Sequence, residues 1–244
     1  MKSAFHSGVS GLVAHQQMLD TVGNNIANVN TAGFKPQTTR FEDLLYTQMN
    51  TKYNPDVLKG VGVKAAYSQL HSDQAALLNT GVRLDFAIMG DGYFQVDNEG
   101  RREFTRDGSF AIGLRNRRTY LTTADGAYVL DMRGRRIELQ ETEGTGVYDY
   151  DILREQVGVF RFANPHALDT ISANRYLPNE DSGAATRDSR RVNQLVQGYL
   201  EQSATNLSDE MASMIRAQRA YQISARLVQT SDQIEEIVNN LRRG

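Results

Sequence analysis

The two ends of the chain carry the same kind of pattern, and this pattern restricts the fold more than any other feature. In residues 1–32 the apolar side chains recur at steps of three, four or seven residues. Such steps place side chains on one face of an α-helix, and a stripe this narrow is typical of a seam between two helices. The sequence therefore predicts an N-terminal helix that packs on another helix. The stripe consists of Phe5, Val9, Leu12, Leu19, Val22, Ile26 and Val29.

The end of this first helix is predicted from a short run of residues. Gly33 can adopt the left-handed conformation that suits position C′, just past a helix. Phe34 would then be C″ and Val29 would be C3, the two positions that make the hydrophobic contact of a Schellman cap. Pro36 prevents the helix from continuing.

The C-terminal segment repeats the helical pattern. Hydroxyl and amide side chains at positions 203–208 suit an N-cap, and Asp209 and Glu210 favour the first turn of a helix. From Leu207 to Val228 one stripe steps by four and three residues, after which the register shifts. The sequence predicts a helix of about 35 residues, roughly 50 Å long. The stripe consists of Leu207, Met211, Met214, Gln218, Tyr221, Ala225 and Val228.

Between the two helices the period changes to that of β-strands. Short apolar runs between residues 85 and 162 are separated by turn sequences such as Asn98-Glu99-Gly100, Asp125-Gly126 and Arg133-Gly134. Residues 163–189 are polar and are expected to be irregular. Residues 35–80 are expected to connect the regions, with a helix-prone stretch at 41–46.

These patterns together predict the fold class and the domains. We expect an α+β protein in which long N- and C-terminal α-helices pack as a coiled-coil-like pair, with an all-β domain inserted between them. Residues 1–34 and 190–244 would supply the two helices, residues 35–80 the connection, and residues 81–189 the β-rich domain.

The composition argues against several classes of function. The formal net charge is −2 over 244 residues, which does not favour binding of nucleic acid. The chain has no Cys, so it has no disulfides and no thiolate ligands or nucleophiles. No apolar run approaches the ~20 residues that cross a bilayer. We therefore expect no direct membrane insertion, and the N-terminus lacks the apolar core of a cleaved signal peptide.

No residue pattern indicates catalysis, a cofactor or a metal. The four histidines lack a second ligand at metal-site spacing. Gly90-Asp91-Gly92 resembles half of a dinucleotide fingerprint but precedes a strand. Asp149 and Asp151 could pair as acid and base, although their setting favours an exposed edge strand. Five Arg-Arg pairs could line a phosphate groove, be solvated, or form ion pairs with neighbouring subunits: Arg101-Arg102, Arg117-Arg118, Arg135-Arg136, Arg190-Arg191 and Arg242-Arg243.

The length of the terminal helices favours self-assembly. A lone pair of such helices leaves much apolar surface uncovered, so we expect further copies of the chain to cover it. Gly8, Gly11 and Gly23 weaken the first helix, which indicates that the helices become ordered on assembly. Met214, Tyr221 and Val228 share one stripe and are expected inside a helical assembly. The predicted assembly interface is Leu12, Leu19, Val22, Ile26, Met211, Met214, Tyr221 and Val228.

Several stretches of the chain also resemble one known family. The N-terminal run contains Ala27, Asn28, Thr31, Gly33 and Phe34 in the family spacing. Further similar stretches follow in the same order along the chain, at 41–46, 85–94, 104–110, 197–201 and 214–221. On these residues the sequence is similar to the bacterial flagellar rod and hook family of axial proteins. It is most similar to the rod proteins, distal or proximal, and less to the hook protein, and its middle segments at 47–80 and 140–180 are shorter than in the distal rod protein.

The resemblance implies a structural role outside the cytoplasm, in the rod of the flagellar basal body. It implies export through the flagellar type III apparatus without a cleaved signal. The terminal helices would form the inner tube of a homo-oligomeric helical assembly, the β domain would form its outer layer, and other rod and hook proteins would be neighbours. Two alternatives of a different class are a β-domain binding protein with an oligomerising helical stalk and a peptidoglycan hydrolase fused to a rod module.

Overall fold

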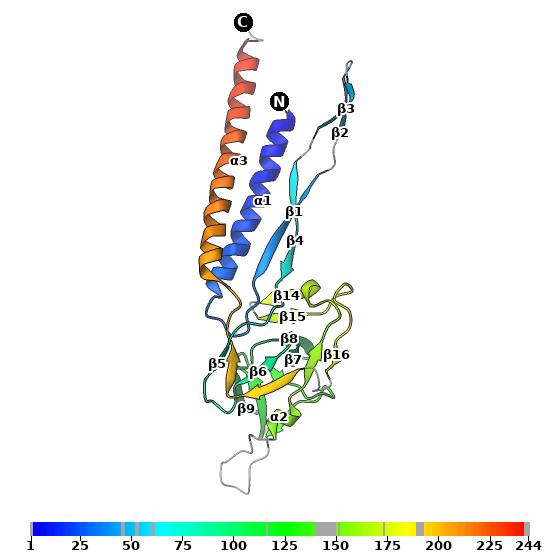
Figure 1. The fold of residues 1–244 in the computed structure, drawn as a ribbon, viewed down its shortest axis with the longest axis vertical. Helices are drawn as coiled ribbons and strands as arrows, with labels where there is room; N and C mark the ends of the chain where they lie inside the picture. Colours follow the sequence, from blue (N-terminus) through cyan, green and yellow to red (C-terminus); the bar gives the residue numbers. More distant parts are fainter. Residues whose placement is uncertain are drawn as a thin grey trace. The chain divides into compact units, whose positions relative to one another are not determined.

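The computed structural model describes residues 2–44, 47–51, 54–59, 62–115, 117–139, 150, 152–172, 174–188 and 193–241. The chain forms two compact units (Figure 1). The first, here called the helical unit, contains Met1–Ala27, Gln37–Gln69 and Asn206–Gly244. The second, the β unit, contains Asn28–Pro36 and Leu70–Thr205.

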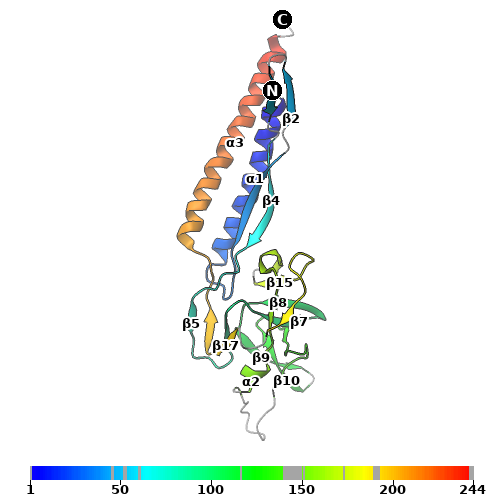
Figure 2. The ribbon, with the colours of Figure 1, turned by 45° about the vertical axis from the view of Figure 1, so that its right-hand side comes forward.

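The helical unit is built on the two predicted terminal helices. Helix α1 spans Lys2–Ala27 and helix α3 spans Leu207–Leu241, and the two lie side by side in contact (Figures 1 and 2). The Ser208 amide donates to Oδ1 of Asn206, 3.1 Å away, so the predicted N-terminal cap of α3 is confirmed. The 35-residue length of α3 is also as predicted.

The end of the first helix differs from the prediction. Helix α1 stops at Ala27, and residues 28–33 form turns. The Thr31 amide donates to the Asn28 carbonyl at 3.1 Å, and asparagine and threonine favour such local bonds over helix. Gly33 has the expected positive φ of 66°, but it is not the C′ residue of α1. The predicted cap with Phe34 and Val29 is therefore wrong.

A two-part β-ribbon completes the helical unit. Strand β1 (Gln37–Asp43) pairs with β4 (Val63–Leu70), and β2 (Thr47–Thr51) pairs antiparallel with β3 (Asn54–Lys59). The expectation of helix at 41–46 is wrong for Phe41, which lies in β1, while residues 45 and 46 are outside the described residues. The Phe41 ring packs on His15 of α1, with 5.7 Å between ring centroids. This packing on α1 overrides the local propensity for helix.

The β unit contains one large sheet, in which ten described strands take part. Its main path runs β12-β10-β11-β7-β8-β15-β14, and β9, β13 and β16 pair at its sides. The strands are β7 (Tyr93–Asn98), β8 (Arg101–Thr105), β9 (Phe110–Arg115), β10 (Arg118–Thr123), β11 (Tyr128–Val129), β12 (Glu138–Leu139), β13 (Val159–Arg161), β14 (Asp169–Ser172), β15 (Arg175–Leu177) and β16 (Thr186–Arg187). The short helices α2 (Leu153–Gln156) and η1 (Pro165–Ala167) lie in the connections.

The predicted turns of this unit are confirmed. Glu99 and Gly100 have φ of 52° and 90° between β7 and β8, as a two-residue hairpin loop requires. Gly126 and Gly134 also have positive φ, at 84° and 78°. Glycine tolerates this conformation without a Cβ clash, so the turn positions could be predicted from sequence.

Two clusters of buried side chains form the core of the β unit. Phe94 belongs to one cluster and its neighbour Tyr93 to the other. Successive residues of a strand point to opposite faces, so the two clusters lie on opposite sides of β7. Both contain T-shaped aromatic pairs, such as Phe94–Phe110 at 5.1 Å and Phe104–Phe162 at 4.9 Å between ring centroids.

Two segments have more β-structure than predicted. Residues 163–189, expected to be irregular, contain η1, β14, β15 and β16, and Tyr176 of β15 is fully buried. Residues 194–201, placed by the sequence in the C-terminal helical region, form β17 (Gln194–Gln197) and β18 (Tyr199–Glu201). These strands pair with β6 (Phe86–Met89) and β5 (Leu77–Asn79). Their partners are distant in sequence, so local periodicity did not reveal them.

Candidate functional site

Two glycines determine how closely α1 and α3 approach each other. A Cβ atom on Gly8 would lie 3.0 Å from Cγ2 of Val228, and one on Gly11 would lie 3.2 Å from Oγ of Ser224. A Cβ on Gly23 would meet no atom of the described residues within 4 Å. The sequence predicts only that all three glycines weaken the helix, whereas in the structure Gly8 and Gly11 are packing positions.

The eight residues predicted for the assembly interface lie in different surroundings. Val22 is buried, with 5% of its surface exposed, and Val228 contacts α1 of the same chain at Gly8. Met211 is 54% exposed. The other five are half-buried: Leu12, Leu19, Ile26, Met214 and Tyr221. Their role in contacts between subunits stays a prediction.

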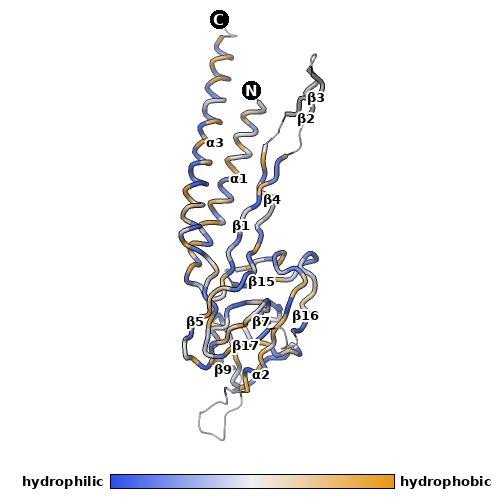
Figure 3. The backbone as a smooth tube through the Cα atoms, in the orientation of Figure 1, coloured by the Kyte–Doolittle hydropathy of each residue, from blue (hydrophilic) through white to orange (hydrophobic). Residues whose placement is uncertain are grey.

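Helix α3 has a second apolar face, which the α1 contact leaves exposed. Ile223 is the most exposed of the large hydrophobic residues in the middle of the helix, at 70%. Hydrophobic segments recur along the whole of α3 (Figure 3). Exposed apolar patches of this kind mark interaction surfaces. This face, here called the free face, comprises Met211, Ile215, Ile223, Ile234, Ile237, Val238 and Leu241.

Asn25 joins α1 to both of its neighbours in the helical unit. Its Nδ2 donates to the Gln37 carbonyl at 2.8 Å and to Oε1 of Glu210 at 2.9 Å. Its Oδ1 accepts from the Gln37 amide at 3.0 Å. Nearby, Thr39 of β1 donates to the Thr21 hydroxyl at 2.8 Å. These bonds hold the ribbon and α3 against the C-terminal end of α1.

The signature residues lie where α1 ends and the β unit begins. Ala27 is the last residue of α1, and the Thr31 hydroxyl donates to Oδ1 of Asn28 at 3.1 Å. Phe34 is buried, with 3% of its surface exposed. A Cβ on Gly33 would lie 2.5 Å from the carbonyl carbon of Arg106. Glycine is therefore required at position 33 both by its φ and by this close approach.

Directly after the signature, three charged side chains meet in the interior of the β unit. Nζ of Lys35 lies 2.6 Å from Oε1 of Glu201, and the Arg106 guanidinium lies 3.1 Å from Oε2 of the same carboxylate. All three side chains are 0–1% exposed. We call this group the charge cluster.

Backbone carbonyls satisfy further donors of the charge cluster. Lys35 Nζ donates to the carbonyl of Asp73. The Arg106 guanidinium donates to the carbonyls of Gly90 at 2.6 Å and Ile88 at 3.3 Å. Buried charges are tolerated only where such bonds accompany the ion pairs.

Burial changes the protonation equilibria around the cluster. Desolvation lowers the pKa of Lys35, opposed by Glu201 and assisted by the Arg106 charge. Burial also raises the pKa of Tyr93 to about 12, although the Arg106 guanidinium, 5.4 Å from the ring centroid, acts against this rise. Two cations share one carboxylate here, so loss of the Lys35 proton leaves a balanced Arg106–Glu201 pair. These three residues lie in or next to family-like stretches, but no sequence signal indicated that they meet.

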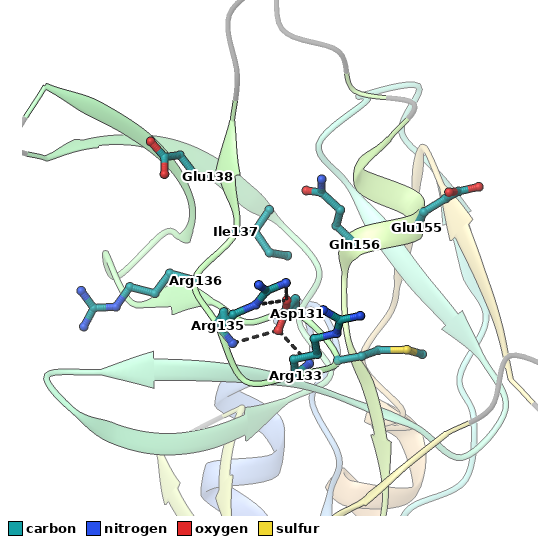
Figure 4. Close-up of a pocket in the computed structure, with 9 residues that line it drawn as sticks. Asp131, Arg133, Arg135, Arg136, Ile137, Glu138, Glu155 and Gln156 are labelled. Carbon is teal, nitrogen blue, oxygen red and sulfur yellow. Dashed lines mark hydrogen bonds and ion pairs between the residues drawn. The ribbon is translucent and has the colours of Figure 1, made fainter.

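One of the five arginine pairs, Arg135-Arg136, forms ion pairs within the chain through both of its members. Arg135 contacts Asp131 at 3.0 Å, beside a surface pocket of about 590 Å³ (Figure 4). Arg136 contacts Asp97 at 2.7 Å and stacks 4.2 Å from the Tyr128 ring centroid. Glu138 and Glu155 also line the pocket, so its charges of both signs balance and do not favour a phosphate site. The pairs at 190–191 and 242–243 are outside the described residues.

The remaining sequence candidates are Asp149, Asp151 and Gly90-Asp91-Gly92. Asp149 and Asp151 are outside the described residues. Gly90-Asp91-Gly92 lies between β6 and β7 and does not begin a helix, which excludes the phosphate-binding arrangement of the fingerprint. Within the described part of the chain, no three His, Cys, Asp or Glu side chains are grouped to hold a metal ion. No helix of the described residues is long and apolar enough to cross a membrane.

Comparison with protein families supports the resemblance in three parts of the chain. Residues 5–35 match the family described as flagella basal body rod protein. Residues 87–153 match the flagellar hook protein FlgE/F/G D1 domain, and residues 196–241 match the flagellar basal body rod FlgEFG protein C-terminal family. These segments contain α1 with the signature, much of the large sheet, and α3.

Similar proteins extend the match to the full chain. The flagellar basal-body rod protein FlgG of Borreliella burgdorferi is 36% identical, and the rod protein FlgG of Bacillus subtilis is 34% identical, each over 100% of both chains. The flagellar hook protein FlgE of Treponema pallidum is 38% identical over 46% of this chain and 26% of its own length. The helix pair and D1-type sheet thus define the class of flagellar axial proteins. The chain belongs to the flagellar rod and hook family, in which the two full-length relatives named above are rod proteins FlgG.

Proposed function

We infer that this chain is a structural subunit of the bacterial flagellar basal-body rod. The observation that carries this inference is the identity of 34–36% to rod proteins FlgG over the complete length of both chains. The hook protein match covers less than half of the chain, which favours rod over hook.

We propose that the subunit assembles with copies of itself into a hollow helical tube. The free face of α3 supports this proposal, because an exposed apolar face of seven large side chains is stabilised when further helices cover it. In this tube α1 and α3 form a coiled-coil-like inner pair, and the predicted interface residues contact neighbouring subunits. Glycines at positions 8 and 11 support close helix packing of this kind.

The proposed tube transmits torque and conducts exported subunits. Its inner layer consists of the helices that the sequence assigned to 1–34 and 190–244, and its outer layer of the β-rich region assigned to 81–189. The segment assigned to 35–80 connects the two layers. Neighbouring rod and hook proteins are the proposed partners along the axis, at the distal rod or, alternatively, the proximal rod.

The proposed location is outside the cytoplasm, in the flagellar basal body. The chain would leave the cell through the flagellar type III export apparatus and retain its N-terminus. We propose no catalytic activity. Among the described residues, the charge cluster and the surface arginines Arg135 and Arg136 form ion pairs, which is a structural role. Mass spectrometry of assembled material tests export: loss of 20 or so N-terminal residues would indicate a conventional signal peptide.

Complementation with electron microscopy tests the rod assignment. A strain that lacks this chain is expected to be non-motile and to have basal bodies with an incomplete rod, and the intact gene should restore both. A hook subunit would instead leave a complete rod without a hook. Normal basal bodies and motility in the deletion strain would favour the binding protein with a helical stalk.

A further inference from the structure

The polypeptide passes between the helical unit and the β unit four times. The passages lie after residues 27, 36, 69 and 205. Three segments of the β unit adjoin these passages: residues 28–36, residues 70–76 and residues 201–205. We call them the three connections. They are far apart in sequence, so what holds them together must be tertiary structure.

Backbone hydrogen bonds join the three connections in pairs. The Gly33 amide donates to the Glu201 carbonyl at 2.8 Å, and the Ala204 amide donates to the Phe34 carbonyl at 3.0 Å. The His71 amide donates to the Pro36 carbonyl, and the Gln202 amide to the Ala76 carbonyl, both at 2.9 Å. Each connection thus contacts both of the others.

The charge cluster draws on all three connections. Lys35 comes from the first, the Asp73 carbonyl from the second, and Glu201 from the third. Oε1 of Glu201 also accepts from the Ala75 amide of the second connection, at 2.9 Å. Arg106, on the loop after β8, joins the cluster to the large sheet and touches the Gly33 backbone.

A buried cluster of this composition is stable only when complete. Removing one partner of a buried ion pair leaves a charge without compensation, and this costs far more than the loss of an exposed pair. Undocking the third connection would remove the carboxylate from two cations. Undocking the first would remove Lys35 from Glu201 and open the Gly33 contact with Arg106.

We propose that the Lys35–Glu201–Arg106 cluster is a lock that couples the three connections, so that each is held in place only while the others are docked. This inference goes beyond the proposed rod function and does not depend on it. If the lock operates, the connections that follow α1 and precede α3 are ordered together or not at all.

Hydrogen exchange of the full-length chain tests the lock. Glu201→Gln keeps the side-chain shape and removes the shared carboxylate. Amide exchange is expected to rise at least about a hundredfold in all three connections, because two buried cations lose their partner. Strands β7 and β10 should keep wild-type exchange. The matched control is Glu138→Gln, which breaks the exposed Arg118–Glu138 pair (3.4 Å) and should leave exchange in the connections unchanged.

Two results would overturn the proposal. A rise confined to residues 201–205 would show that the connections open independently. An equal rise throughout the β unit would show that the cluster supports the whole core. If Glu201→Gln does not fold, Lys35→Met provides the test, because it leaves the Arg106–Glu201 pair in place. A smaller rise in all three connections is then expected, and a rise limited to residues 28–36 would refute the lock.

Discussion

The β unit and the helical unit bury their side chains in different ways. The β unit encloses two clusters rich in aromatic residues and an ion-pair cluster with almost no exposed surface. In α3, by contrast, Ala217 and Ser231 are the buried residues among those described, and large apolar side chains remain exposed. Burial of apolar surface is the main source of stability. We therefore expect the β unit to be stable by itself and the helical unit to become stable in the proposed assembly.

The largest effect is expected from a charge on the free face of α3. Ile223→Asp should abolish assembly and motility, because burying an unpaired carboxylate costs several kcal/mol. The unfolding transition of the β unit in the monomer should not change. Motility assays with thermal unfolding of the purified monomer measure both effects, and Gln222→Asp, the exposed polar neighbour, is the control. A motile Ile223→Asp strain would contradict the role of the free face.

A smaller but still large effect is expected in the signature segment. Gly33→Ala should destabilise the β unit by more than about 3 kcal/mol, because a left-handed φ and a backbone contact both oppose a side chain. Gly81 has nearly the same φ, 67°, but a Cβ there would meet no described atom within 4 Å. Gly81→Ala should therefore cost only about 1–2 kcal/mol. Urea unfolding of both variants measures the difference, and equal costs would show that the Arg106 contact is unimportant.

The charge cluster should make stability depend on pH. The pKa of Lys35 is lowered from 10.5 in the folded state, so between the two values the unfolded chain binds more protons. The free energy of unfolding should therefore rise with pH in this window, by no more than about 1.4 kcal/mol per pH unit. Lys35→Met should remove this contribution, and exposed Lys64→Met should retain it. Unfolding curves measured between pH 7 and pH 9.5 test this prediction. If the free energy of unfolding of wild type and of Lys35→Met depended on pH with the same slope, the lowered pKa of Lys35 would be refuted.

The smallest effect is expected from the glycines of α1. Gly23→Ala should stabilise the helix by about 0.5–1 kcal/mol, because no described atom obstructs the added methyl group. Gly8→Ala should gain less or destabilise, since its Cβ would lie only 3.0 Å from Val228. Circular dichroism during thermal unfolding of the assembled subunits measures both, because the helical unit is expected to be stable there. Equal gains would show that α3 does not pack at Gly8.

Sequence reasoning was most accurate where the structure depends on neighbouring residues. The stripes of α1 and α3, the Asn206 cap and the turns at Gly100, Gly126 and Gly134 all follow from local spacing and backbone preference. It failed where distant partners decide. Phe41 lies in a strand that packs on α1, and Tyr176 lies in a strand that pairs with β8.

The same division applies to the candidate site. The signature could be recognised from its spacing, and the positive φ of Gly33 could be predicted from its residue type. The reason for that glycine could not, because the Arg106 backbone that it contacts lies more than 70 positions further along the chain. Likewise, periodicity placed apolar side chains on α3 but did not show which face α1 covers.

The amino-acid sequence by itself determined the two terminal helices, the β-rich middle and the membership of the flagellar rod and hook family. These features depend on the spacing of residue types along the chain, which can be read directly from the sequence. Tertiary structure alone decided that Lys35, Arg106 and Glu201 meet, that Gly8 and Gly11 form the helix seam, and that a second face of α3 stays exposed. A buried charge has no periodic pattern, since its partners are selected by proximity in space and by the cost of leaving any of them unpaired.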